Sequence, residues 1–209
     1  SYKIISPLRA KYPNLVLDCN SVFTTSSEIY LLDALKTINK DFGFDNMSVT
    51  YARGVIKDDS LKNVSKNRYK EINKFLEERE KNKEKRLLYP LWRGVNSVSR
   101  ENLMRTVFDD EFVTSCVAGR KLLVVSETGE VQPCEILGKS IGNLRNHDWD
   151  LKKLLKENSV NKMQKWIKET KCKCSFECAL AANVVWKPKN YPKVISSAIK
   201  NIGKSHLNH

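Results

Sequence analysis

The chain has 209 residues, 41% hydrophobic and 9% aromatic, so it is long and apolar enough to bury a core and is not a disordered tail. No apolar run reaches the roughly 20 residues that a membrane-spanning helix needs. The first residues also lack the apolar core of a secretory signal. We therefore expect a cytoplasmic protein with no membrane partner.

A formal net charge of +13 raises the question of nucleic-acid binding. The lysines are mixed with acidic residues along the chain, and even their densest stretch, residues 62–86, has the pattern of a solvated helix face. Because no nucleic-acid-binding motif accompanies the charge, we expect no nucleic-acid partner.

Residues 14–86 predict alternating strands and helices. An apolar, β-branched run over 14–24 is typical of a buried strand, and Thr25 and Glu28 have the spacing of a capping box that begins a helix. A second strand is predicted over 47–53 and a second helix over 66–86. Apolar residues recur at helical spacing in both helices: Ile29, Leu32, Leu35 and Ile38 in the first, and Tyr69, Ile72, Phe75 and Leu76 in the second. This order implies an α/β fold with parallel strands and right-handed crossovers.

The alternation of predicted strands and helices ends at Pro90, and we place a domain boundary there, between residues 1–90 and 91–209. The second domain is expected to be a small α+β domain with a β-hairpin, in which Gly129 supplies the positive φ of the turn. Ser159 is the expected N-cap of a helix, and the basic tail is expected to fray. The predicted elements are a helix over 95–112, hairpin strands over 121–125 and 131–134, and short helices over 150–155 and 160–170.

Six cysteines carry the chemical signal of the sequence: Cys19, Cys116, Cys134, Cys172, Cys174 and Cys178. Without a secretory signal, metal ligation is a stronger interpretation than a disulfide framework. Cys19 lies alone in an apolar strand and is expected to be a core residue. The other five form two groups, one bracketing the hairpin and one in a tight Cys-x-Cys-x3-Cys segment, and converging thiolates of this kind suit zinc or an iron–sulfur cluster.

Cations flank these cysteines, and we expect them to favour the thiolate form. The flanking residues are Arg120, Lys121, Lys171 and Lys173. The alternative interpretation is that the cysteines are reduced, buried and packed as small hydrophobic residues.

The pattern Cys116-x12-Gly129-x4-Cys134 resembles the opening motif of SPASM and twitch domains, the auxiliary-cluster modules of radical S-adenosylmethionine (radical SAM) enzymes. Ile141-Gly-Asn-Leu144 is similar to a short element that those domains carry next, and residues 172–183 look like the closing segment of a related subgroup. The resemblance implies one auxiliary 4Fe–4S cluster held by Cys116, Cys134, Cys178 and either Cys172 or Cys174. A full SPASM motif has further cysteines that this chain does not have, so one cluster is the most that we expect.

The reactive cluster of radical SAM enzymes is held by a Cys-x3-Cys-x2-Cys motif that is missing here. Only Cys174 and Cys178 have the three-residue gap, and Ala181 stands where a third cysteine is needed. Residues 14–86 resemble the last part of the partial (β/α) barrel of that family, with residues 51–54 at a strand end that would face the active site. The resemblance therefore implies the C-terminal part of a radical SAM oxidoreductase or maturase, with no catalytic residues in this chain.

Partners and cofactors follow from the same resemblance. S-adenosylmethionine would be used only by a longer parent, which is expected to act on a peptide or protein, and the open edge of a partial barrel predicts a homodimer. Two alternatives remain: a structural zinc module whose basic surface contacts nucleic acid or an acidic partner, and a metal-free thiol protein.

Overall fold

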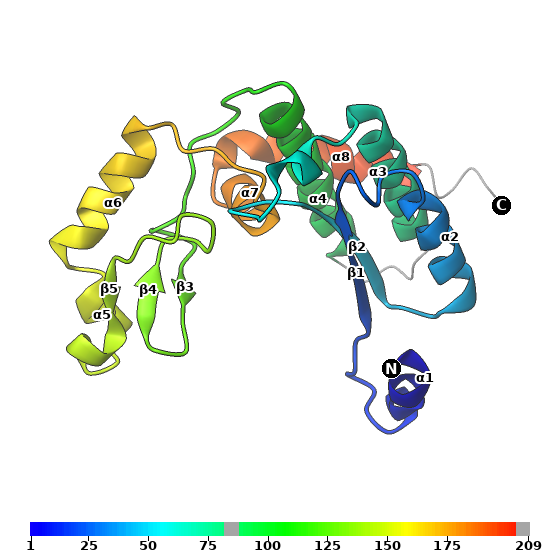
Figure 1. Cartoon of the computed structure of the whole chain (residues 1–209), viewed down its shortest axis with the longest axis horizontal. Coiled ribbons are helices and arrows are strands. Elements are labelled where there is room, and N and C mark those ends of the chain that lie inside the picture. The colour runs from blue at the N-terminus through cyan, green and yellow to red at the C-terminus, as the bar shows by residue number, and fades with distance from the viewer. Residues whose placement is uncertain (82–87, 204–209) are drawn as a thin grey trace. The chain divides into compact units, whose positions relative to one another are not determined.

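The computed structural model describes residues 1–81 and 88–203 (Figure 1). The chain divides into two compact units. Unit 1 comprises residues 1–52 and 56–83, and unit 2 comprises residues 53–55 and 84–209. Both strands and helices are present in each unit, so the fold is mixed α/β. Among the described helices, none has the length and apolar character that crossing a membrane requires.

Unit 1 is built on two parallel strands, and its elements follow the predicted strand–helix–strand–helix order. The strands pair in register from Asp18 with Asn46 to Phe23 with Tyr51. The elements in chain order are α1 (Tyr2–Ile5), η1 (Ser6–Ala10), β1 (Asp18–Phe23), α2 (Leu31–Asp41), β2 (Asn46–Tyr51), η2 (Asp59–Lys62) and α3 (Lys66–Lys81). The last residues of the helix predicted over 66–86 lie outside the described part of the chain.

The two faces of the β1–β2 sheet differ in character. Phe23, Met47 and Tyr51 point to the buried face, where the Phe23 ring stacks on Tyr69 of α3 with their centroids 5.6 Å apart. The helices α2 and α3 lie on one side of the strands (Figure 1). The other face is polar, and its side chains bond to one another: Asn46 donates to Asp18 at 2.8 Å, and Ser48 and Thr50 donate to Asn20 at 3.1 and 3.0 Å.

The capping box expected at Thr25 and Glu28 does not form, and this prediction was wrong. Glu28 instead accepts a hydrogen bond from the backbone N–H of Ser65 at 3.1 Å, just before α3. The Thr25 N–H donates to the carbonyl of Leu61 at 3.1 Å. Because both groups bond to a distant segment, α2 begins only at Leu31, and Ile29, expected on the apolar stripe, is 78% exposed.

Helices α4, α7 and α8 form one part of unit 2. The helix α4 spans Tyr89–Phe108, α7 spans Glu177–Val185, and α8 spans Tyr191–Gly203 after the short 3₁₀-helix η4 (Pro188–Asn190). The prediction began α4 too late because it took Pro90 as a boundary, whereas proline is tolerated in the first turn of a helix. A Cβ on Gly94 would lie 2.5 Å from the carbonyl oxygen of Val194, so glycine permits the close approach of α4 and α8.

The predicted hairpin is present and gains a third strand. The strands β3 (Val124–Val125) and β4 (Glu130–Gln132) pair antiparallel, and β5 (Gly142–Asn143), which the sequence did not predict, pairs with β4. Gly129 has φ +83°, the conformation expected for its turn. Val131, Ile141, Leu144, Leu154 and Val160 form the core under this sheet.

The short helices of unit 2 complete this core. They are η3 (Leu144–His147), α5 (Leu151–Leu154) and α6 (Asn158–Glu169). Ser159 is not the N-cap that the sequence predicted: Glu157 occupies that position, and the Ser159 hydroxyl donates to the carbonyl of Ile141 at 2.6 Å. The hydroxyl therefore ties α6 to the segment that leads into β5.

Candidate metal centre

Four of the six cysteines pack on one apolar cluster of unit 2. They come from three segments: Cys116 precedes β3, Cys134 follows β4, and Cys172 and Cys174 lie between α6 and α7. The cluster consists of Ala118, Ile167, Phe176 and Ala179, together with Cys134, which is 4% exposed. The hairpin and the loop after α6 thus bring together thiols that are far apart in the sequence.

Two of these sulfur atoms accept backbone hydrogen bonds. The N–H of Ala118 donates to Cys116 Sγ, and the N–H of Phe176 donates to Cys174 Sγ, each at 3.4 Å. In both cases the donor lies two residues after the cysteine, so the loop itself directs an N–H at the sulfur. Such bonds favour a negatively charged sulfur, because a thiolate is the stronger acceptor.

Asn183 of α7 forms hydrogen bonds with the segment that contains Cys116. Its Oδ1 accepts the backbone N–H of Val117 at 2.8 Å, and its side chain is also hydrogen-bonded to Cys116, which acts to lower the pKa of that thiol. Asn183 is only 4% exposed. The sequence signal for this residue is that it is a single asparagine within the apolar run of α7, because a buried amide needs a hydrogen-bond partner.

Lys187 also acts on this segment. Its ammonium donates to Thr114 Oγ1 at 2.8 Å, to Ser115 Oγ at 2.6 Å and to the Ser115 carbonyl. Burial lowers the pKa of Lys187, while the nearby Cys116 acts to raise it. Lys187 therefore places a cation beside the cysteine cluster, and sequence inspection did not single it out.

Burial raises the pKa of three of the clustered thiols. The pKa of Cys172 and of Cys174 rises to about 11, mainly through burial and further through the neighbouring cysteines. The pKa of Cys116 is raised for the same main reason. The expectation that flanking cations favour the thiolates was wrong, since burial outweighs them. Lys173 instead pairs with Asp110 at 2.6 Å, and Lys121 lies over the Trp186 ring.

Cys178 and Cys19 lie apart from the four clustered cysteines. Cys178 is exposed in the first turn of α7, whereas Cys174 lies before that helix begins. Cys19 is partly buried on β1 of unit 1. The loop that ends at Phe176 therefore turns Cys172 and Cys174 toward the apolar cluster, and Cys178 lies on the surface of α7.

The space among the thiols is small. A gap of about 10 Å³ is bordered by Cys116, Cys172 and Cys174 together with Asn183, which is about the volume of one water-sized sphere. Across residues 1–81 and 88–203, no three side chains of the ligating types are close enough to form a ready-made site for a single ion. Binding of a metal centre would therefore require the thiols to rearrange within their loops.

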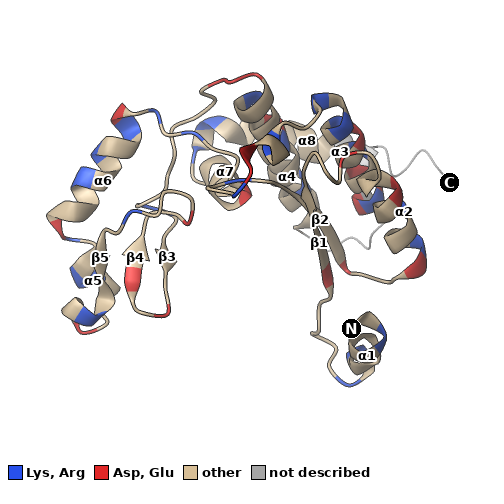
Figure 2. Ribbon diagram, in the orientation of Figure 1, with Lys and Arg blue, Asp and Glu red and all other residues tan. Residues whose placement is uncertain are grey.

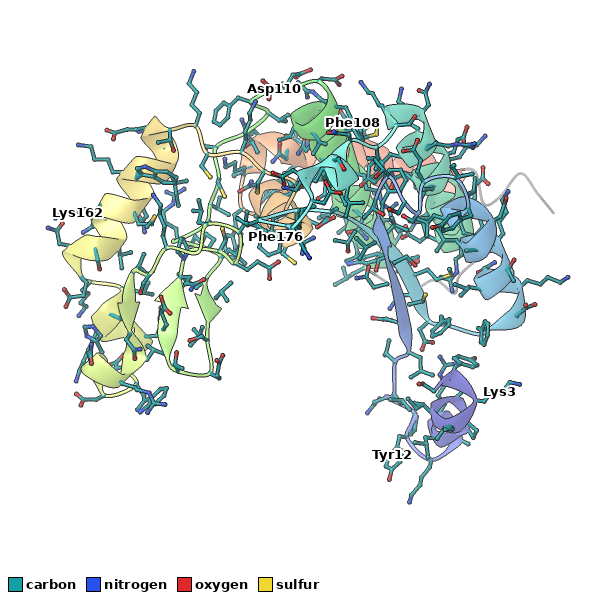
Figure 3. The ribbon with its side chains drawn as sticks, in the orientation of Figure 1. Lys3, Tyr12, Phe108, Asp110, Lys162 and Phe176 are labelled. Atoms are coloured by element: carbon teal, nitrogen blue, oxygen red, sulfur yellow. The ribbon has the colours of Figure 1, made fainter. Side chains whose placement is uncertain are left out.

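Arg53 belongs to the same surroundings, because residues 53–55 are part of unit 2. Its guanidinium pairs with Glu135 at 3.0 Å and with Glu177, the residues that follow Cys134 and precede Cys178. It also lies over the ring of Phe176, 4.8 Å from the centroid; Figure 3 labels this ring beside α7. Arg53 thus links the segments that carry the cysteines.

Comparison of the chain with protein-family models, with curated proteins and with solved structures finds no match in any of the three.

Proposed function

We propose that this chain is the C-terminal part of a radical SAM oxidoreductase or maturase and that it holds one auxiliary 4Fe–4S cluster. The supporting observation is that Cys116, Cys134, Cys172 and Cys174 converge on one apolar cluster from three segments of unit 2. Backbone N–H groups directed at two of the sulfurs add to this support. The proposed ligand set leaves out Cys178, which is exposed, and uses both Cys172 and Cys174.

The donor set fits the proposed group in chemical type. Four cysteine thiolates are the common ligands of such clusters, which when bound supply one-electron transfer. The protein's own part is to give up thiol protons as metal binds, to hold Cys116 through Asn183, and to exclude water with the apolar residues around Phe176. Lys187 supplies a positive charge that offsets the negative charge of assembled thiolates.

The sheet of unit 1 supports the partial-barrel part of the proposal. In a (β/α) barrel the helices cover only the outer face of the strands, whereas a doubly wound sheet is covered on both faces. The β1–β2 sheet has one apolar face and one polar face, the latter carrying Asp18, Asn20 and Ser48. Helices on one face and an open polar face on the other are consistent with strands from an open, partial barrel of a longer parent enzyme.

A structural zinc site is the second candidate, and one observation favours it. The gap that Cys116, Cys172 and Cys174 border is small, and a single zinc ion requires less space among the thiols than a cluster does. Zinc would need the sulfurs to close to about 3.8 Å from one another, given tetrahedral Zn–S bonds of about 2.3 Å.

Metal analysis of the protein purified without oxygen tests the proposal. About four irons and four sulfides per chain, with visible absorption, are expected for one cluster. One zinc per chain without sulfide would contradict the iron–sulfur cluster and support the structural zinc site. Absence of both iron and zinc would contradict both proposals.

Alkylation followed by mass spectrometry tests the ligand set. In the metal-loaded protein we expect Cys178 to be alkylated as fast as in the metal-free protein, because it is exposed and outside the cluster. Cys116, Cys134, Cys172 and Cys174 are expected to react only after the metal is removed. If metal instead protects Cys178 and leaves Cys172 or Cys174 reactive, this ligand set is wrong. The result would then support the set implied by the family resemblance, in which Cys178 is a ligand.

A further inference from the structure

A cavity of about 510 Å³ opens in unit 2 between α6 and the segment that contains Cys116. Its volume lies within the range of small-molecule binding sites. Cys116 borders both this cavity and the gap among the thiols. A molecule bound in the cavity would therefore lie directly beside the cysteine cluster.

The lining of this cavity is cationic. Arg120, Lys165 and Lys168 contribute to its wall, and among the described lining residues there is no carboxylate. Figure 2 shows the basic residues gathered along α6. Lys165 also lies 3.7 Å from Glu169, one turn further along α6, but both side chains are well exposed and such pairs are weak in water.

Uncharged groups in the lining restrict what the cavity can bind. Ser115 and Asn161 offer hydrogen-bond donors, and Ile167 provides an apolar floor. The Gln164 amide is already committed, because its Nε2 donates to the Gly119 carbonyl at 2.9 Å and so fixes the wall between the helix and the loop. The combination of a cationic rim, polar donors and an apolar floor suits an acidic group on an aliphatic stem.

We infer that this cavity binds a carboxylate-bearing peptide segment, with the acid placed against Arg120, Lys165 and Lys168. A guanidinium presents two parallel N–H donors that match the two oxygens of a carboxylate, and the lysines add positive charge. The aliphatic stem of a glutamate or aspartate would pack on Ile167 and Ala118. The role of such binding rests on the proposed function, in which an acidic part of the substrate is held beside the auxiliary cluster. The binding itself does not require metal.

The test uses the full-length metal-free chain, whose fold is first verified by circular dichroism, and the peptide N-acetyl-Glu-Glu-Glu-Glu-amide, with the all-glutamine peptide as the uncharged control. Saturable binding of the glutamate peptide alone is expected. The double variant Lys165→Gln/Lys168→Gln should bind it roughly tenfold more weakly, as for loss of about 1.4 kcal/mol. Glutamine keeps good helix propensity in α6, so the variant should remain folded.

A matched variant separates the cavity from the general charge of the protein. Lys152→Gln/Lys162→Gln removes the same charge from exposed positions that do not line the cavity, and Lys162 projects from the outer side of α6 (Figure 3). This variant should bind the peptide like the original chain. An equal loss of peptide affinity in both double variants would show that the peptide is attracted by the net charge of +13 and not by the cavity, and would overturn the inference.

Cys116 supplies a readout within the cavity itself. The bound glutamate peptide should slow alkylation of Cys116 and leave that of exposed Cys178 unchanged. Unchanged alkylation of Cys116 at saturating peptide would overturn the inference. Free glutarate and inorganic phosphate should compete only weakly with the glutamate peptide for the cavity. Tight binding of either would show that the cavity is a site for a small anion and would overturn the inference of a peptide. Because no metal is present, these results are independent of the iron and sulfide analysis.

Discussion

Asn183 joins two parts of the segment at Cys116 with one side chain. Its oxygen accepts the N–H of Val117, while its amide contacts the thiol. A buried group of this kind is costly to remove, because its partner is left without a hydrogen bond. The residue therefore combines a structural role with control of one proposed metal ligand.

Replacing Asn183 separates these two roles. Asn183→Leu leaves the Val117 N–H unpaired and is expected to lower the free energy of unfolding by about 1–3 kcal/mol, measured by urea titration. Asn183→Asp keeps an acceptor for Val117 but replaces the donor to Cys116 with a negative charge. The aspartate variant should thus fold better than the leucine variant yet release its metal faster than the original chain, as followed with a chelator. Equal metal release in the aspartate variant and the original chain would show that Asn183 has only a structural role.

Tyr51 gives unit 1 a pH-dependent contribution to stability. Burial raises the pKa of Tyr51, and its hydroxyl donates to the carbonyl of Lys62 at 2.5 Å. A raised pKa in the folded state means that the neutral phenol is favoured there. Its contribution is fully present below the unfolded value of about 10 and is lost as pH rises through the folded value.

Comparison with Tyr51→Phe isolates this contribution from other titrating groups. The difference in unfolding free energy between the original chain and Tyr51→Phe should be constant from pH 7 to pH 9 and should shrink above pH 10. Circular dichroism with urea at each pH measures it. A difference that stays constant to pH 11 would show that the Tyr51 hydroxyl has the same pKa in the folded and unfolded states.

At the scale of elements, the close contact of α4 and α8 depends on Gly94. Alanine normally stabilises a helix by up to about 1 kcal/mol relative to glycine. Here its Cβ would lie 2.5 Å from the Val194 carbonyl oxygen, and a backbone group cannot move aside as a flexible side chain can. Overpacking of this kind costs about 1–3 kcal/mol, so it outweighs the gain in helix propensity.

Gly94→Ala is therefore expected to lower the melting temperature of the chain, measured by circular dichroism. Ser97→Ala, on the same helix, is the control and should have little effect. A higher melting temperature for Gly94→Ala would show that α8 moves away from α4 at little cost.

The elements that the sequence predicted well are those with strong local patterns. The paired strands, α3 and the hairpin at Gly129 follow from apolar periodicity and turn chemistry. Errors arose where a polar group had a distant partner: Glu28 bonds to Ser65, and Ser159 bonds to Ile141. Local sequence cannot distinguish a cap from such a long-range bond.

Some features of the candidate metal centre could likewise be predicted from the sequence, and others could not. The sequence predicted that cysteines would gather, because a hairpin and a short cysteine-rich loop bring thiols together. It did not indicate that Cys178 would be exposed, since that depends on α7 beginning at Glu177. Nor did it single out Asn183 or Lys187, whose importance follows only from their contacts with residues 114–117.

At the scale of the whole molecule, the proposed metal centre belongs to unit 2 alone. A thiolate-bound metal can contribute folding free energy on the order of 10 kcal/mol. Metal loading should therefore slow amide hydrogen exchange in α6, α7 and the segments at Cys116 and Cys134, and should leave α2 and α3 unchanged. Mass spectrometry of exchanged peptides measures this.

Two cysteine variants complete the comparison. Cys134→Ala should abolish the metal-dependent slowing, and Cys19→Ala should retain it, because Cys19 lies in unit 1. Equal slowing in both units of the original chain would contradict a centre confined to unit 2.

The position of Arg53 has a practical consequence for dissecting the protein. Residues 53–55 belong to unit 2, although both flanking stretches of chain belong to unit 1. A gene fragment that begins at residue 84 would therefore encode unit 2 without the guanidinium that pairs with Glu135 and Glu177. Both carboxylates would lose their ion pair with Arg53, and the Phe176 ring would lose its contact with the guanidinium. Unit 2 is thus discontinuous in the gene, and no single cut of the coding sequence isolates it whole.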